Sequence, residues 1–535
     1  MSIYRLKIEL FKKLPRYIVI LYAIAFISSI SFAIFALSKQ LTFGFDQARD
    51  AYEAYSIWHN HDFKILGPSS DLPGVHHGVL WYYLLALPYA IGSGNPEVVA
   101  AIFFVLSFLT IPLSAYLSYK LFHNFHVALL TAVLYASSPL FQAFTRWLSN
   151  PLIALYVVPF LLFFLWKYID KQKTVNKRSI LSENKYVIGL IGLFFGIFIQ
   201  ADFAFGLFLI ILPIYWFVYK ISFKLQEFIF FWIGFLFGIF TYVLAEVRFS
   251  GKAVLGMIDF FSSSLSSPRS PVDTILLVVE RVNDLLSISI LPFPYAILLF
   301  VVLVIMFLLK KSKNTNNKNS IVFLVIWLST FIVFYLFKSG FLHSGFMFVP
   351  FLLPITIIGS YLLINTITSL KFLVALLTLV FLAQFYTSYL WFKTEYNPLS
   401  VQYGISLSLE KEIIRYTYEQ SKGERFIIVT ITNPLHINTT WAYLYETYGQ
   451  KKYSYLPYYG GRAQRGYLGN LSERQFGTKY RYVIVEPTTG IPDYFIQQII
   501  SEENTVSDII EEKKFGQFVV QKRIFRENKS QISIQ

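Results

Sequence analysis

The stretch that decides the fold class is Tyr17-Ile-Val-Ile-Leu-Tyr-Ala-Ile-Ala-Phe-Ile-Ser-Ser-Ile-Ser-Phe-Ala-Ile-Phe-Ala-Leu-Ser38, which contains no charged residue. About 20 apolar residues are enough to cross a bilayer as a helix. Comparable runs recur along the chain as far as Trp391. Only helices and closed barrels satisfy their backbone hydrogen bonds in lipid, and these runs are too long for barrel strands. The sequence therefore predicts a polytopic α-helical membrane protein.

The overall composition agrees with this class. The 535 residues are 55% hydrophobic and 14% charged, whereas soluble domains are about 25% charged. A net charge of +15 could indicate nucleic acid, but most Lys and Arg flank the apolar runs, where they set topology. Cysteine is absent, which excludes disulfides, thiolate metal sites and a cysteine nucleophile. The first apolar run has no cleavage pattern after it, so we expect no cleavable signal.

The basic residues also predict how the chain is oriented. They are dense before residue 17 and in the loops near 167–185, 220–224 and 310–318. With about eleven spans, all of these segments fall on the cytoplasmic side, as the positive-inside rule requires. The N-terminus is then cytoplasmic, and everything after Trp391 is extracytoplasmic. The spans are predicted near 17–38, 97–119, 128–142, 151–168, 186–200, 203–220, 226–246, 286–309, 320–338, 345–365 and 371–391.

One apolar segment is left out of this count. Residues 79–91 are too few to span a bilayer and predict an interfacial or re-entrant helix. Counting them as a span would place every later Lys-rich loop outside. We therefore expect residues 39–96 to form one long external loop that partly enters the membrane, and residues 247–285 to form another.

The chain divides into two predicted parts, a transmembrane module at 1–395 and a soluble extracytoplasmic α/β domain at 396–535. After about Asn397, short β-branched runs alternate with helical patterns, which is typical of a layered α/β domain. Strands are expected at 425–431, at 480–485 and within 515–525, and helices at 405–420, 436–448 and 492–501.

A charged cluster follows the first span. Asp46, Arg49, Asp50 and Glu53 are spaced i, i+3, i+4 and i+7, so a helix would carry them on one face. An acidic residue at a membrane boundary can act as a general base toward a hydroxyl or an amine. It can also bind a metal ion that holds a phosphate. A salt-bridged surface helix explains the same spacing without any function.

Further candidates lie in other segments predicted to be external. His76 and His77 precede an aromatic segment and could contact an anionic head group, although an interfacial aromatic belt has the same composition. Gln200 and Asp202 interrupt a long apolar stretch, where a charge is costly, or they form a simple turn. Basic residues in short loops could hold a phosphate, or they could only set topology. These are Arg146, Lys338 and His343.

The order and spacing of these motifs resemble the GT-C superfamily of membrane glycosyltransferases, which includes protein O-mannosyltransferases and the aminoarabinose transferase that acts on lipid A. The resemblance is carried by Phe45-Asp46-Gln47-Ala48-Arg49, by His77-Gly78-Val79-Leu80-Trp81-Tyr82-Tyr83, and by the segment from Gly92 to Pro96. It covers residues 15–220 well and the later spans loosely. The chain departs from many relatives in having Gln47 rather than Glu, and in having no proline after His77.

The resemblance implies a transferase that uses a polyprenyl-phosphate-linked sugar as donor, with a lipid, glycan or protein acceptor at the extracytoplasmic face of the bilayer. Asp46 takes the position of the acidic base or metal-associated residue, and His77 falls where many relatives carry a lysine that faces the donor phosphate. Phosphate is already a good leaving group, so no nucleotide is required, and a need for a divalent metal is left open. The expected substrate-binding residues are Arg49, Asp50, His76, His77, Arg146, Gln200, Asp202, Lys338 and His343.

A transporter or flippase of lipid-linked sugars is the main alternative. Such a protein needs polar residues through the middle of several spans. Here the charged residues concentrate at the predicted external ends, which favours a reaction at that face. The sequence also has no Walker motif or glycine-rich phosphate loop, which argues against an ATP-driven transporter.

Overall fold

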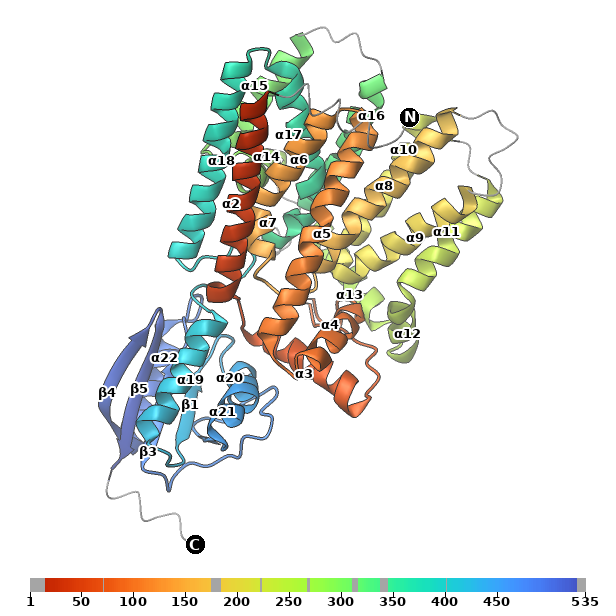
Figure 1. Ribbon diagram of the computed structural model, residues 1–535. Helices are drawn as coiled ribbons and strands as arrows, with labels where there is room; N and C mark the ends of the chain where they lie inside the picture. Colours follow the sequence, from red (N-terminus) through yellow and green to blue (C-terminus); the bar gives the residue numbers. More distant parts are fainter. Residues whose placement is uncertain are drawn as a thin grey trace.

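The computed structural model describes residues 15–70, 72–174, 184–221, 224–266, 270–309, 316–336, 345–400 and 402–526. Within these residues, a bundle of helices extends to Lys393 and is followed by a unit that contains one five-stranded sheet. Figure 1 shows this C-terminal unit at one end of the bundle, next to α3 (Phe45–Asn60). The predicted class, a helical bundle followed by a small α/β unit, agrees with this architecture.

Six helical segments are long and apolar enough to cross a membrane. They include α2 (Arg16–Gln40), α5 (Pro96–Phe122), α8 (Leu152–Thr174), α16 (Asn316–Leu336), α17 (Val349–Thr366) preceded by η3 (Gly345–Phe348), and α18 (Leu370–Lys393). A seventh span results if α11 (Leu225–Gly238) and α12 (Phe240–Arg248), which meet at 66°, are counted as one. The chain is thus a membrane protein, but eleven spans are not confirmed, and the crossing of the remaining predicted segments stays a prediction.

Shorter helices occupy the other predicted spans. They are α6 (Phe125–Ser137), α7 (Pro139–Phe144), α9 (Asn184–Ala201), η1 (Phe203–Ile210), α10 (Ile211–Tyr219) and α15 (Ala296–Leu309). The predicted span near 286–309 is not one continuous helix, because α14 (Pro271–Ser289) ends before α15 begins. Pro292 and Pro294 lie in the break, and proline disfavours helical backbone in the residue before it.

The long loop predicted over 39–96 contains two helices. α4 (Leu80–Ile91) is the short helix expected over 79–91, and α3 (Phe45–Asn60) carries the charged cluster. The loop predicted over 247–285 likewise contains helices, namely α13 (Lys252–Ser266) and most of α14. α3 packs against α4, so the charged cluster rests on the aromatic segment that follows the two histidines.

The sheet has the strand order β2-β1-β3-β5-β4. β1 pairs parallel with β2 and β3, whereas β5 pairs antiparallel with β3 and β4. The strands are β1 (Ile427–Ile431), β2 (Tyr458–Tyr459), β3 (Tyr480–Val485), β4 (Ser507–Phe515) and β5 (Phe518–Phe525), and the helices are α19 (Leu407–Ser421), α20 (Thr439–Leu444), η4 (Tyr445–Gln450), α21 (Lys451–Tyr453) and α22 (Asp493–Val506). The expected elements are therefore present, whereas β2, β4 and the short helix α21 were not predicted.

The C-terminal unit packs directly on α3 and on the end of α2. The backbone N–H of Leu407 donates a hydrogen bond of 2.9 Å to the carbonyl oxygen of Leu41. The Tyr52 hydroxyl on α3 donates one of 2.7 Å to Glu446. Lys411 also forms an ion pair of 2.7 Å with Glu97 at the start of α5. These contacts fix the C-terminal unit against the helical bundle where α3 begins.

Candidate active site

A cavity of about 410 Å³ lies between the helical bundle and the C-terminal unit. The charged and titratable residues that line it are Asp46, Arg49, His77 and Asp202. These four residues come from three separate segments of the chain, and the sequence singled out each of them. The rest of the lining is neutral, and it includes Ser69, Ser70, Trp147, Ser149, Asn150, Phe346, Ser400, Gln402 and Asn433.

The start of α3 is held against the bundle by Gln47. Its side-chain Oε1 accepts a hydrogen bond of 3.0 Å from the backbone N–H of Gly44, which caps the helix. Its Nε2 donates one of 2.9 Å to the carbonyl oxygen of Leu148. A backbone hydrogen bond of 3.0 Å from Thr42 to Arg146 reinforces this junction. Gln47 therefore joins the first turn of α3 to the segment before α8.

The predicted charged face of α3 divides into an exposed acid and a buried one. Arg49 lies between them, with Nη1 2.8 Å from Asp46 Oδ1 and Nη2 2.7 Å from Asp50 Oδ1. The Asp46 side chain is 59% exposed, whereas that of Asp50 is 2% exposed. The second oxygen of Asp50 accepts a hydrogen bond of 2.8 Å from Trp81 Nε1. A substrate in the cavity can therefore meet Asp46, while Asp50 acts only through Arg49.

Burial and neighbouring charges shift the pKa values of Asp50 and Arg49. Burial raises the pKa of Asp50 to about 6, although Arg49 and the Trp81 hydrogen bond lower it. Burial by itself lowers the pKa of Arg49, but the two neighbouring carboxylates outweigh it and raise that pKa. Arg49 thus stays charged and holds Asp46 through one carboxylate oxygen. The other oxygen, Oδ2, accepts no hydrogen bond from the residues that the structure describes.

His77 and Asp202 form the second charged pair of the cavity. His77 Nδ1 lies 4.0 Å from Asp202 Oδ2, which is beyond a direct hydrogen bond. This nitrogen is buried and has no hydrogen-bond partner among the described residues. Asp202 caps η1, because its Oδ1 accepts a hydrogen bond of 2.9 Å from the backbone N–H of Ala204. His77 also lines the cavity, so its ring can contact a ligand that binds there.

Two other predicted residues serve in packing and do not line this cavity. His76 Nδ1 lies 3.0 Å from the carbonyl oxygen of Gly67. Gln200 Nε2 donates a hydrogen bond of 2.6 Å to the carbonyl oxygen of Gly238, at the break between α11 and α12. A Cβ atom at Gly78 would overlap the Gln200 side chain, so glycine is needed where the two segments meet. Substrate contact by His76 and Gln200 stays a prediction.

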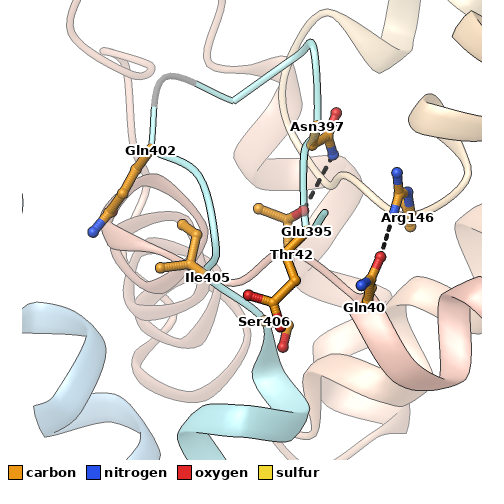
Figure 2. Close-up of a pocket in the computed structure, with 8 residues that line it drawn as sticks. All are labelled: Gln40, Thr42, Arg146, Glu395, Asn397, Gln402, Ile405 and Ser406. Atoms are coloured by element: carbon orange, nitrogen blue, oxygen red, sulfur yellow. Dashed lines mark hydrogen bonds between the residues drawn. The ribbon is translucent and has the colours of Figure 1, made fainter. Parts of the chain in front are cut away.

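Arg146 lies in a small recess next to the cavity, shown in Figure 2. Its Nη1 donates a hydrogen bond of 2.5 Å to Gln40 Oε1, and its Nη2 donates one of 3.2 Å to the carbonyl oxygen of Tyr396. Burial lowers the pKa of Arg146 to about 10. The recess shares Gln402 and Ile405 with the cavity, so the guanidinium lies behind one of its walls.

The remaining basic candidates, Lys338 and His343, lie outside the described residues. Another buried cation, Arg281 on α14, was not predicted. Its Nη1 lies 2.8 Å from Asp284, and its guanidinium lies 4.9 Å from the ring centre of Phe348. In the sequence it is one basic residue in an amphipathic helix, and only the packing of α14 against the bundle shows that it is buried.

No group of three or more His, Asp and Glu side chains with the geometry of a metal site occurs among the described residues. In the cavity, the carboxylates that a cation could use are those of Asp46 and Asp202, and Arg49 already pairs with the first.

The fold is shared with solved membrane enzymes. The apo structure of ArnT from Cupriavidus metallidurans, a lipid A aminoarabinose transferase, matches with a TM-score of 0.54 and 10% identity over 94% of this chain and 97% of ArnT. ArnT bound to undecaprenyl phosphate gives 0.53 and 10% over the same shares. The oligosaccharyltransferase AglB from Archaeoglobus fulgidus, in complex with an inhibitory peptide and a dolichol-phosphate, gives 0.46 and 13% over 77% of this chain and 62% of AglB.

Comparison with protein-family models gives no match, and comparison with curated protein sequences gives none either. The structural likeness nevertheless extends over nearly the whole of both chains in the case of ArnT. The chain therefore shares the fold of ArnT, and the resemblance that its motifs predicted is confirmed at the level of the fold.

Proposed function

We propose that this protein is a membrane glycosyltransferase that moves a sugar from a polyprenyl-phosphate-linked donor to an acceptor at the extracytoplasmic face. The observation that carries the proposal is the exposed Asp46 carboxylate, which Arg49 holds in a cavity between the bundle and the C-terminal unit. The fold supports it, because ArnT shares the architecture from end to end and binds undecaprenyl phosphate in one of its structures.

In the proposed reaction Asp46 is the general base. Its free oxygen takes the proton from an acceptor hydroxyl or amine as that group attacks the anomeric carbon of the sugar. A bond forms between the acceptor atom and the anomeric carbon. The bond from that carbon to the phosphate oxygen breaks, and the polyprenyl phosphate leaves with the electron pair. Arg49 and Asp50 keep the carboxylate in place and do not take up the proton.

The donor phosphate would be bound near His77, whose buried Nδ1 is without a hydrogen-bond partner among the described residues. A charge-assisted hydrogen bond from protonated His77 to a phosphate oxygen is stronger than a neutral one. Arg146 would add positive potential from behind the wall, and we keep Lys338 and His343 as further candidates for this role. The isoprenoid chain would lie among the helices of the bundle.

The topology belongs to the same proposal. About eleven spans would make up residues 1–395, with the N-terminus in the cytoplasm, and residues 396–535 would form an extracytoplasmic domain that covers the cavity. A flippase of lipid-linked sugars is the alternative. The charged lining at one end of the bundle favours a transferase, because a translocation path would need polar groups along the spans.

The experiment that separates these functions uses the purified full-length protein in lipid nanodiscs with undecaprenyl-phosphate-linked hexoses and pentoses. A transferase releases undecaprenyl phosphate when an acceptor is present, whereas a flippase moves the intact lipid and releases none. Absence of release with every donor, in the presence of membrane-derived lipid, glycan and protein acceptors, would reject the proposed function.

A further inference from the structure

One wall of the cavity is built by the C-terminal part of the chain. It comes from the segment that follows α18 and from the turn that follows β1, and its residues are Leu399, Ser400, Gln402, Ile405, Asn433 and Pro434. None of these side chains carries a charge, in contrast to Asp46, Arg49, His77 and Asp202 elsewhere in the lining. The wall therefore offers hydrogen bonds and apolar contact but carries no formal charge.

The hydrogen bonds of Gln402 fix the orientation of its amide. Its Nε2 donates to Glu486 Oε2 at 3.0 Å and to the carbonyl oxygen of Pro487 at 3.1 Å. Both partners can only accept, so the nitrogen must face them and Oε1 must face the other way. Oε1 lies 3.9 Å from the place where a Cβ atom at Gly44 would stand. This oxygen thus faces the start of α3, where Asp46 lies.

Asn433 is held in the same manner. Its Nδ2 donates a hydrogen bond of 3.0 Å to the carbonyl oxygen of Thr489, and its backbone N–H donates one of 2.9 Å to Glu486 Oε2. The side-chain Oδ1 accepts no hydrogen bond from the described residues. The wall consequently carries two amide oxygens, one from Gln402 and one from Asn433, that are not used within the part of the chain described.

Glu486 joins the two amides. Its carboxylate is buried and accepts hydrogen bonds from Gln402, from the Asn433 backbone and, at 2.8 Å, from Trp441 Nε1. A buried carboxylate needs such partners, because removing a charge from water without them is costly. Glu486 does not line the cavity, so its role in the wall is to position Gln402 and Asn433.

Aromatic rings complete the lining. Trp147 and Phe346 both line the cavity, and their rings are stacked with centres 6.2 Å apart and planes at 21°. Flat aromatic faces suit the apolar faces of sugar rings. Amide oxygens that only accept suit hydroxyl hydrogens, and they disfavour phosphate or carboxylate groups, which bring no hydrogens to donate.

We propose that this wall is the acceptor subsite and that Gln402 Oε1 and Asn433 Oδ1 bind hydroxyl groups of a neutral saccharide acceptor. The inference rests on the proposed glycosyl transfer and adds the acceptor class to it. The lipid-linked donor must approach from the bundle, since its isoprenoid chain stays in the bilayer. The wall from the C-terminal unit is then the side that an acceptor reaches, with Asp46 between the two.

The test measures release of undecaprenyl phosphate by the full-length protein in nanodiscs, with undecaprenyl-phosphate-linked hexoses and pentoses as donors. Neutral oligosaccharides of glucose, mannose, galactose or N-acetylglucosamine are varied, and glucose 6-phosphate and a serine-rich peptide serve as contrasting acceptors. We expect a neutral oligosaccharide to accelerate release. Gln402→Met and Asn433→Ala should each raise its KM roughly 3- to 10-fold, the usual effect of losing one hydrogen bond.

The same variants should still bind undecaprenyl phosphate like the wild type, which also shows that they fold. Gln420→Met, on α19 and outside the cavity lining, is the matched control and should leave KM unchanged. Unchanged KM in the two cavity variants, or acceleration by the peptide or the phosphorylated sugar alone, overturns the acceptor subsite. A wild type that releases nothing from any donor overturns the proposed function itself.

Discussion

Trp81 donates a hydrogen bond of 2.8 Å from its indole nitrogen to the buried carboxylate of Asp50. This contact joins α4 to α3 and leaves the other oxygen of Asp50 to hold Arg49. Arg49 in turn holds Asp46, the exposed acid of the cavity. The aromatic segment after the two histidines is thus linked to the charged cluster before them. Trp81 positions Asp50, Asp50 positions Arg49, and Arg49 positions Asp46.

The first prediction concerns the pH dependence of turnover. Burial raises the pKa of Asp50 to about 6, so Asp50 becomes protonated and loses its attraction for Arg49 as the pH falls through this value. Wild-type activity should therefore decline below about pH 6. The Asp50→Asn side chain is neutral at every pH. This variant should therefore turn over more slowly than the wild type at every pH, and its rate should not decline below about pH 6 in the same way. A matched control is Asp62→Asn, on the same segment but outside the cavity lining, and it should keep the wild-type profile. If Asp50→Asn shows the same decline in activity below about pH 6 as the wild type, protonation of Asp50 does not cause that decline.

The second prediction concerns stability and Glu410 on α19. Burial, and then the nearby Glu486, raise the pKa of Glu410 well above its usual value. Between the unfolded and the folded pKa, the native state keeps a proton that the unfolded chain has lost. The stability that this provides is present below the unfolded pKa and is lost as the pH rises through the folded one.

Glu410→Gln removes this titration, so the variant should have a higher Tm than the wild type at pH 8, and the difference should shrink toward pH 5. The control is Glu412→Gln, an exposed residue on the same helix, and it should not change the pH dependence. Thermal unfolding of the purified protein at the two pH values gives the comparison. Equal Tm differences at both pH values would show that Glu410 does not hold a proton in the native state.

The third prediction concerns the packing of α9 on α11. A Cβ atom at Gly192 would overlap the backbone carbonyl oxygen of Phe231, so the two helices must separate to accept any side chain. Gly192→Ala should destabilise the protein by about 1–3 kcal/mol, as overpacking typically does. Gly206→Ala is the control, because the nearest atom to a Cβ at this position, on Ile199, would lie 3.8 Å from it, which is an ordinary van der Waals distance. A Tm unchanged by Gly192→Ala in detergent would show that the helices are less tightly packed.

Much of the fold follows from the sequence because long apolar helices and soluble strands leave strong periodic signals. α2 and α5 are examples, as is β1 with its five buried residues. β4 escaped prediction because it is an edge strand whose Asp508, Glu511 and Lys513 read as a polar loop, although charges of this kind protect an edge from pairing. The number of crossings is less certain from sequence, since helices of intermediate length can span or stop within the bundle.

The candidate site, like the fold, could be predicted only in part from the sequence. The spacing of Asp46, Arg49 and Asp50 predicts one helical face, and the structure has that face, but the spacing does not tell which acid is buried. That distinction depends on Trp81 and on the contact of α3 with α4, which are tertiary features. Nothing in the sequence marks Gln402 and Asn433 as site residues, because neutral amides are common in loops. These two residues reach the cavity only because the C-terminal unit packs against the bundle.

The central claim is that Asp46 is the catalytic base, and the most direct test is the rate of undecaprenyl phosphate release by Asp46→Asn in nanodiscs, beside Asp62→Asn and the wild type. Removing a general base typically lowers the rate by about 100- to 10,000-fold. The variant keeps the size of the side chain, so we expect normal insertion and normal undecaprenyl phosphate binding with a rate loss in that range, and a smaller loss for Asp50→Asn. Release by Asp46→Asn at a rate close to that of the wild type would contradict the account.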